Sequence, residues 1–476
     1  MRTVSFRDPE GFIFPLDEKI CRVVSVEAAG RLLAHLDKVE CRGLVEQGKL
    51  VWTRRAGAET AARVLSSGDP QVEDRKAQSP VEVLEHESIW FPSYPAEWSA
   101  GMLQGAAITT LDLAQSLLPC GLGLKDATPW NVLFRGPRPV WVDTLSIEQR
   151  DPGDGIWRPL AQFLETFLYP LWIARHSAIA THELFLLHRN GVPMEVAWRS
   201  LGNASRLRPS IFHWLTLPHL LARASKPDYS KDHRLPDPSS AREMLRRMFA
   251  SLRRAVEKTE PRSGTPTHWK DYSGKCHYEA RDRQAKRDFV HGVLKAWRRG
   301  RVLDLGCNDG EYSEMAARLG HEVVAVDSDA GVINHLWLRA REHDLSILPL
   351  IGDVSNPIPG SGWRNAESRS FLARGAGRFD GVMALALLHH LTITARVPLA
   401  MVLDLIADFT RHSAIVEYVS PEDPMYQQLL RGRAHLHGGD SSEAFEAAAV
   451  QRFEIADRLP LPGNRRSLYH LVRKGG

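Results

Sequence analysis

The stretch RVLDLGCNDGEYSEMAARLGHEVVAVDSDAG, residues 301–331, decides the fold of the C-terminal half of the chain. The apolar run RVLDL predicts a buried strand, EYSEMAARL predicts an amphipathic helix that ends at Gly320, and HEVVAVD predicts a second buried strand. A strand, a turn, a helix and a strand over this length form a βαβ unit. The glycine turn between the first strand and the helix predicts a nucleotide site.

The spacing of the turn narrows the class of ligand. The sequence GCNDG, residues 306–310, lacks the second and third glycines of the GxGxxG pattern, whose backbone amides close on a pyrophosphate. Asn308 and Asp309 give the turn a polar, partly acidic lip, which suits a ligand with an ammonium group and no phosphate. Asp327 ends the second strand, where a carboxylate can hold ribose hydroxyls.

These motifs resemble those of class I S-adenosylmethionine-dependent methyltransferases. VLDLGCNDG, VVAVDSD, ILPLIGDVSNP, RFDGVMALALLHHL, SAIVEYV and a closing hairpin follow in the family's order over residues 268–474. The resemblance implies a doubly wound, Rossmann-like α/β sheet with S-adenosylmethionine as its cofactor. A doubly wound sheet that binds another nucleotide is the alternative. The implied cofactor contacts are Asp304, Gly306, Asn308, Gly310, Asp327 and Asp353, of which Asp353 stands where the family contacts the adenine amino group.

The candidate catalytic residues follow the predicted fourth strand. His389 and His390 lie in LALLHHL, where the carboxyl edge of the sheet is expected, and an imidazole can accept a proton from an attacking hydroxyl or amine. Neighbouring side chains project differently, so we expect one histidine to face the cofactor, unless the pair is only a hydrogen-bonded strand end. The sequence lacks the Asn/Asp-Pro-Pro-Tyr/Phe and Pro-Cys motifs of nucleic-acid methyltransferases. A small molecule or a peptide is therefore the expected acceptor.

The segment before the first predicted strand offers further cofactor contacts. Trp269, Tyr272 and Tyr278 are candidates to cap the cofactor, and Lys286 or Arg287 to bind its carboxylate. The alternative for the basic pair is an amphipathic helix with solvated charges.

A second resemblance lies in residues 1–225. Asp126 and Asn131, five residues apart in a loop, and Asp143 after the strand PVWVD resemble the catalytic and metal loops of the protein kinase and aminoglycoside phosphotransferase superfamily. No glycine-rich phosphate loop or V-A-I-K strand is present, and Lys19 or Arg22 is a poor substitute for the phosphate lysine. We therefore expect a degenerate α+β kinase-like domain whose three polar residues help to bind the substrate, or else form structural turns.

The remaining features set the organisation of the chain. Residues 226–267 are predicted to form a linker with an amphipathic helix, packed through Leu245, Met248, Phe249, Leu252 and Val256, and residues 268–476 to form the methyltransferase domain. The five cysteines are scattered without ligand spacing, so we expect no bound metal. No signal peptide or membrane span is evident, which favours a cytoplasmic protein without membrane contact.

The sequence thus predicts methyl transfer from S-adenosylmethionine to an unidentified acceptor. Two alternatives remain open: a bifunctional methyltransferase and phosphotransferase, and a non-catalytic scaffold that binds the cofactor.

Overall fold

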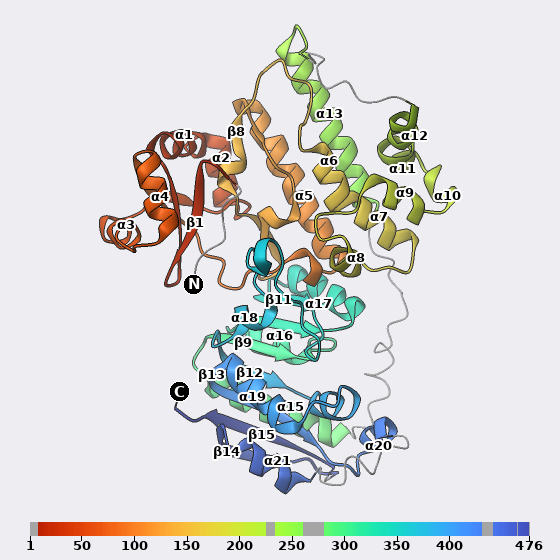
Figure 1. The fold of residues 1–476 in the computed structure, drawn as a ribbon. Coiled ribbons are helices and arrows are strands. Elements are labelled where there is room, and N and C mark those ends of the chain that lie inside the picture. Colours follow the sequence, from red (N-terminus) through yellow and green to blue (C-terminus); the bar gives the residue numbers. More distant parts are fainter. Residues whose placement is uncertain (1–7, 225–233, 260–279, 431–440, 464, 476) are drawn as a thin grey trace. The chain divides into compact units, whose positions relative to one another are not determined.

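The computed structural model describes residues 8–224, 234–259, 280–430, 441–463 and 465–475. The chain divides into two compact units (Figure 1). Unit 1 comprises residues 1–262 and 360–368, and unit 2 comprises residues 263–359 and 369–476.

Unit 2 is built on one sheet of seven strands. Its order is β11 (Ile347–Ile351), β10 (Glu322–Asp327), β9 (Arg301–Leu305), β12 (Phe379–Ala384), β13 (Thr410–Val419), β15 (Arg466–Arg473) and β14 (Phe453–Pro460). The first five strands are parallel, and β15 pairs antiparallel with both of its neighbours. This is the doubly wound sheet expected from the motifs, and the closing hairpin lies at its edge.

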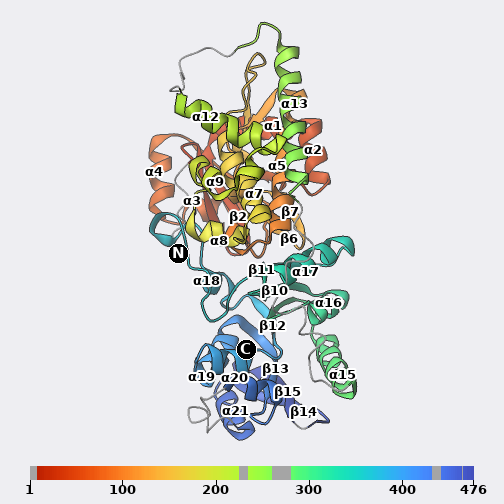
Figure 2. The same ribbon diagram turned by 90° about the vertical axis from the view of Figure 1, so that its right-hand side faces the viewer.

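Helices cover both faces of this sheet. Figure 2 shows α15 (Ala280–Ala296), α16 (Glu311–Arg318) and α17 (Ala330–Glu342) on one side, and α18 (Phe371–Gly375), α19 (Leu399–Phe409) and α21 (Ser442–Ala449) on the other. The short α20 (Pro424–Leu430) follows β13. Val302, Val323 and Ile347 face α15–α17 in one buried cluster because these β-branched residues fill a surface that is covered on both faces.

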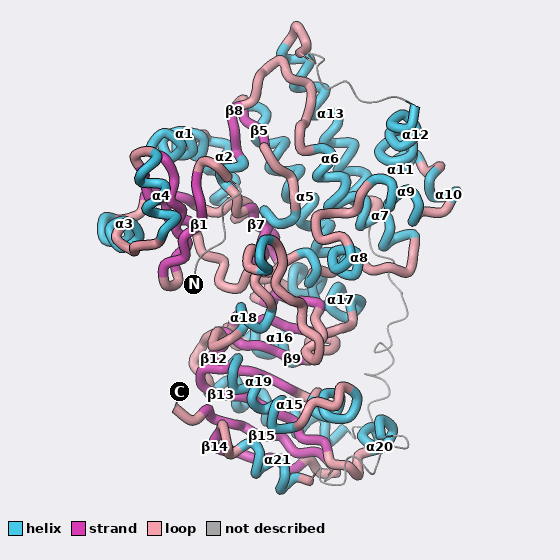
Figure 3. Tube along the Cα trace, in the orientation of Figure 1, coloured by secondary structure: helices cyan, strands magenta, loops and turns pink. Residues whose placement is uncertain are grey.

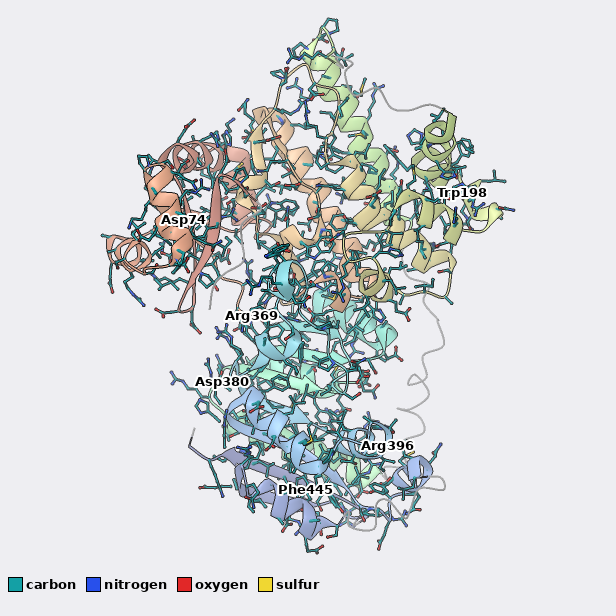
Figure 4. All side chains as sticks on the ribbon, viewed as in Figure 1. Asp74, Trp198, Arg369, Asp380, Arg396 and Phe445 are labelled. Atoms are coloured by element: carbon teal, nitrogen blue, oxygen red, sulfur yellow. The ribbon has the colours of Figure 1, made fainter. Side chains whose placement is uncertain are left out.

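Individual side chains tie the layers of unit 2 together. Phe445 on α21 is fully buried, and its ring centroid lies 4.6 Å from that of Tyr469 on β15 (Figure 4). Asp380 at the start of β12 accepts a hydrogen bond from the backbone amide of Arg301 at 2.7 Å and so fixes the start of the neighbouring β9. These contacts hold the strands in register, and the carboxyl ends of β9, β10 and β12 then lie at one edge.

Unit 1 begins with an antiparallel sheet of four strands. Their order is β1 (Gly11–Leu16), β2 (Lys19–Ser25), β4 (Val81–His86) and β3 (Thr53–Arg55). Four helices accompany the sheet in sequence: α1 (Val26–Leu36), α2 (Val39–Glu46), α3 (Ala58–Leu65) and α4 (Pro70–Gln78). β1 and β2 form an antiparallel hairpin in which Leu16 pairs with Lys19.

The rest of unit 1 is mostly helical (Figure 3). The long α5 (Ala100–Leu117) is followed by two short strand pairs, β5 (Leu122–Leu124) with β8 (Ile147–Gln149) and β6 (Val132–Arg135) with β7 (Arg138–Trp141). The later helices are α6 (Leu160–Phe163), α7 (Tyr169–His176), α8 (Thr181–Leu187), α9 (Met194–Ser200), α10 (Asn203–Arg206), α11 (Pro209–Ile211), α12 (Leu217–Ala224) and α13 (Pro238–Glu257).

The amphipathic helix predicted in residues 226–267 is α13. Leu245, Phe249, Leu252 and Val256 are buried, as its apolar stripe predicts, and Met248 is half-buried. Arg253 forms an ion pair with Asp112 on α5, because α13 packs along that helix.

No helix in the described ranges is both long enough and apolar enough to cross a membrane.

Candidate active site

A glycine turn follows β9 at the carboxyl edge of the sheet in unit 2. Gly306, Asn308 and Gly310 all have positive φ, and the amides of Gly306 and Cys307 donate to the carbonyl of Val326 at 2.8 and 3.0 Å. The turn is therefore fastened to β10. A Cβ atom at position 310 would come within 2.4 Å of a methyl group of Leu336 on α17, so packing as well as φ requires glycine there.

Asp327 lies at the end of β10, directly beside this turn. Its Oδ2 accepts the amide of Asn308 at 2.9 Å, and its Oδ1 accepts the amide of Asp329 at 3.0 Å. Burial raises the pKa of the Asp327 carboxyl group, while these amide hydrogen bonds lower it. Each carboxylate oxygen has a second lone pair, so the oriented carboxylate fits the two hydroxyls of a ribose.

The two other predicted acidic residues lie in different surroundings. Asp304 on β9 is buried beneath the turn, where its Oδ2 accepts a hydrogen bond from the hydroxyl of Ser313 at 2.6 Å, and burial raises its pKa to about 7. Asp353, after β11, is exposed, and its Oδ1 accepts from the amide and the hydroxyl of Ser355 at 2.8 and 2.6 Å. Asp304 thus ties β9 to α16, and Asp353 stabilises its own turn.

The two candidate catalytic histidines follow β12. Their ring centroids lie 4.3 Å apart, at the start of a short helical segment rather than on the strand itself. His389 is 3% exposed, and neither of its ring nitrogens has a hydrogen-bond partner in the described part of the chain. Burial is the main cause that lowers the pKa of both imidazoles; for His389 the next cause is His390, and for His390 it is Arg466. His389 is therefore a neutral imidazole with two unpaired nitrogens, which is rare in a folded protein.

Four buried or nearly buried charged side chains form a cluster at the carboxyl end of β13, which packs against the helical segment after the histidines. The sequence did not predict this cluster. Nζ of Lys286 on α15 lies 2.6 Å from Oε2 of Glu417 on β13. Arg466 on β15 lies 3.4 Å from the other oxygen of Glu417 and binds both oxygens of Asp423, at 2.7 and 3.2 Å. The one available signal was Glu417 itself, a carboxylate inside the apolar run SAIVEYV.

These contacts bear on the residues proposed to bind the carboxylate of the cofactor. Lys286 is buried against Glu417, and Arg287 forms an exposed ion pair with Glu311. Both basic groups therefore already have acidic partners. The predicted cap residues Trp269, Tyr272 and Tyr278 lie outside the described residues.

In unit 1, the loops that carry the three predicted polar residues lie together. The hydroxyl of Ser146 donates to the carbonyl of Asp126 at 3.3 Å, and the amide of Ser146 donates to the carbonyl of Asp143 at 3.3 Å. The carbonyl of Asn131 accepts the amide of Val142 at 2.9 Å. These contacts show that the segments around Asp126, Asn131 and Asp143 lie next to one another in the fold.

The side chains in these loops are already engaged. Oδ1 of Asp143 lies 3.2 Å from Nη2 of Arg22 on β2, which is 6% exposed. Oδ1 of Asp126 accepts a hydrogen bond from the side-chain amide (Nε2) of Gln162 at 2.9 Å. Among the residues that the structure describes, no group of three or more His, Cys, Asp or Glu side chains has the arrangement of a metal site.

Comparison with known proteins agrees with this geometry. Residues 243–459 match the family model described as a methyltransferase domain. The chain is 31% identical to the nodulation protein NoeA of Rhizobium meliloti over 98% of its own length and 95% of that protein's. A shorter match, 37% identical over 90 residues, joins 19% of the chain to 30% of a ubiquinone biosynthesis O-methyltransferase from Caulobacter.

Solved structures give weaker matches. The magnesium protoporphyrin IX methyltransferase of Synechocystis aligns with 43% of this chain and 93% of its own, at 17% identity and a TM-score of 0.31.

Proposed function

The chain belongs to the family of nodulation protein NoeA and contains a methyltransferase domain whose cofactor is S-adenosylmethionine, and from this premise we propose that it methylates an acceptor with His389 as the base. The observation that carries the proposal is the buried His389 ring, whose two nitrogens have no partner in the described part of the chain. A base is needed at the carboxyl edge of the sheet, and His389 follows β12 at that edge.

The residues at the carboxyl edge of the sheet have separate roles in the proposed reaction. When bound, the cofactor supplies a methyl group that its positive sulfonium has already activated. Asp327 holds the ribose, and the polar turn at 306–310 receives the amino acid end. His389, neutral because burial lowers its pKa, accepts the proton that the acceptor loses as it attacks.

The test compares two adjacent substitutions, His389→Ala and His390→Ala. We expect His389→Ala to lower the release of S-adenosylhomocysteine, measured with a metabolite extract, by ~10²–10⁴-fold without changing cofactor affinity in calorimetry. An equal loss of cofactor binding would show that the histidine is structural. If the wild-type protein binds the cofactor tightly but releases no S-adenosylhomocysteine, the result would favour a non-catalytic scaffold that binds the cofactor.

For unit 1 we propose a binding role without phosphate transfer. The support is the ion pair between Arg22 and Asp143, because the guanidinium already partners a carboxylate that a magnesium ion would need. The resemblance of residues 1–225 to kinases remains a prediction. The polar loops around Asp126, Asn131 and Asp143 are proposed to bind a polar part of the acceptor.

Magnesium-ATP separates this role from the bifunctional alternative. When magnesium-ATP is titrated into the full-length protein, we expect no phosphate transfer. In a second experiment, the variant Asp143→Asn should bind the cofactor as the wild type does but should show reduced methylation with the same extract. Micromolar ATP binding with phosphate transfer would establish a phosphotransferase. Full methylation by Asp143→Asn would leave the loops a structural role only.

A further inference from the structure

The charges beside His389 in unit 2 balance one another. Glu417, with no exposed surface, lies between two cations, and the second of these, Arg466, also holds Asp423 with two hydrogen bonds. Two positive and two negative side chains thus form one chain of contacts, which we call the charge cluster: Lys286, Glu417, Arg466 and Asp423. Its net charge is zero.

The charge cluster lies at the reacting end of the sheet. Glu417 is near the carboxyl end of β13, and Arg466 begins the antiparallel β15, where Val419 and Arg466 are paired in the register. Ile393, in the helical segment that follows His389, packs with Val419 of β13 in one buried cluster, so the segment of the two histidines lies against this end of β13. Lys286, Glu417 and Arg466 also contribute electrostatically to the shift of the His389 pKa. The neighbouring α20 has the sequence PMYQQLL and adds no acidic or basic side chain.

Stability alone does not account for such a cluster. Replacing a buried ion pair with apolar residues of similar volume is often neutral or stabilising, because desolvation offsets the attraction between the charges. A chain of paired charges does hold polar groups in fixed positions beside the site, where the side chains of Lys286 and Arg466 are 8% and 11% exposed. It provides no excess charge, since every cation has a carboxylate beside it.

We propose that the charge cluster reserves this end of the site for an uncharged hydroxyl group, so that the enzyme is an O-methyltransferase of alcohols. This inference rests on the proposed methyl transfer. An ammonium or carboxylate group would bring an uncompensated charge into a region where the charged side chains of the cluster are already paired with one another, at a large desolvation cost. A hydroxyl brings none, and it can donate its proton to the unpaired nitrogen of His389.

The proposed methyl transfer to a hydroxyl group is balanced in atoms, electrons and charge. The hydroxyl oxygen forms a bond to the methyl carbon while the bond between that carbon and sulfur breaks, and the electron pair of that bond stays on sulfur, which becomes neutral. The hydroxyl proton passes to His389, which becomes an imidazolium and later returns the proton to water. The products are a methyl ether, S-adenosylhomocysteine and one proton.

Three probes of one shape test the proposal without knowledge of the natural acceptor: benzyl alcohol, benzylammonium and benzoate. Their binding to the full-length protein loaded with S-adenosylhomocysteine is measured by saturation-transfer NMR. We expect the alcohol to bind at least about tenfold more tightly than either ion. Tighter binding of an ion, or no binding of the alcohol, overturns the proposal.

Two variants that change the net charge of the charge cluster in opposite directions extend the test. Glu417→Gln leaves an excess positive charge and should shift the preference toward benzoate, whereas Lys286→Met leaves an excess negative charge and should shift it toward benzylammonium. The double variant is neutral again and should prefer the alcohol, which also serves as the control for folding. The same preference in all four proteins contradicts the proposal. Methyl transfer itself is judged separately by the release of S-adenosylhomocysteine, so a failure of either idea is recognised.

Discussion

The ammonium of Lys286 and the carboxylate of Glu417 lie 2.6 Å apart in unit 2, and both side chains are buried. They join α15 to β13 across 131 residues of sequence. Removing one member leaves the other as a buried charge with a weaker partner set, whereas removing both leaves only a change in packing. A change in this pair is therefore expected to alter both the stability of the carboxyl edge of the sheet and the charge near His389.

The stability of single and double variants measures this link. Lys286→Met or Glu417→Gln alone should lower the free energy of unfolding by about 3–5 kcal/mol, because each strands a buried charge. The double variant should lose less than the sum of the two. Urea unfolding of the four proteins gives the coupling energy, and additive losses would mean that the two charges do not interact.

Asp327 should dominate cofactor affinity at the ribose. Asp327→Ala removes the acceptor of two charge-assisted hydrogen bonds and should weaken binding of S-adenosylhomocysteine by ~1.5–3 kcal/mol per bond at most. Glu322→Ala is the matched control, since this exposed carboxylate begins β10, at the opposite end of the strand from Asp327. Calorimetry compares the two variants. Unchanged affinity in Asp327→Ala, or tighter binding of NAD by the wild type, contradicts the assignment.

The titration of His389 should respond to each neighbour in a stated direction. Burial lowers its pKa first, His390, Arg466 and Lys286 lower it further, and Glu417 raises it. Because its pKa is lowered, the imidazole stays neutral and active as a base at pH values below the pKa of a free imidazole. Its activity as a base is lost only as the pH falls through the pKa of His389 itself. Lys286→Met should therefore move this pH upward and Glu417→Gln should move it downward. NMR titration of the His389 ring measures both, and shifts in the same direction would contradict the role of the charge cluster.

Asp304 should make the stability of the protein depend on pH. Burial raises its pKa from 3.8 to about 7, so between these values the folded protein holds a proton that the unfolded chain has lost. Folding stability from this group is greatest at low pH and declines by up to about 1.4 kcal/mol per pH unit as the pH rises through that window. Asp304→Asn should remove this decline. Urea unfolding of the cofactor-free protein at pH 5 and 7.5 checks it; an equal decline in the variant would assign the effect to another group.

Local sequence patterns determined much of unit 2. Apolar runs of strand length, the glycine turn at 306–310 and the acid at 327 are each contained in a few consecutive residues, so the strands and the position of Asp327 at the end of one of them were predictable. The same holds for α13, whose apolar stripe predicted its buried side. For the Asp126 and Asp143 loops, the expectation came from the resemblance to the kinase superfamily.

Only the tertiary structure decided the partners of the charged side chains. Lys286 is one of many basic residues in its helix, and no local pattern distinguishes a residue that turns inward to Glu417 from one that remains in water. Arg22 and Asp143 are likewise 121 residues apart. Such pairs form because packing excludes water from both groups at one place, and that depends on how α15, β13 and β15, or β2 and the loop after β7, come together rather than on any one of them.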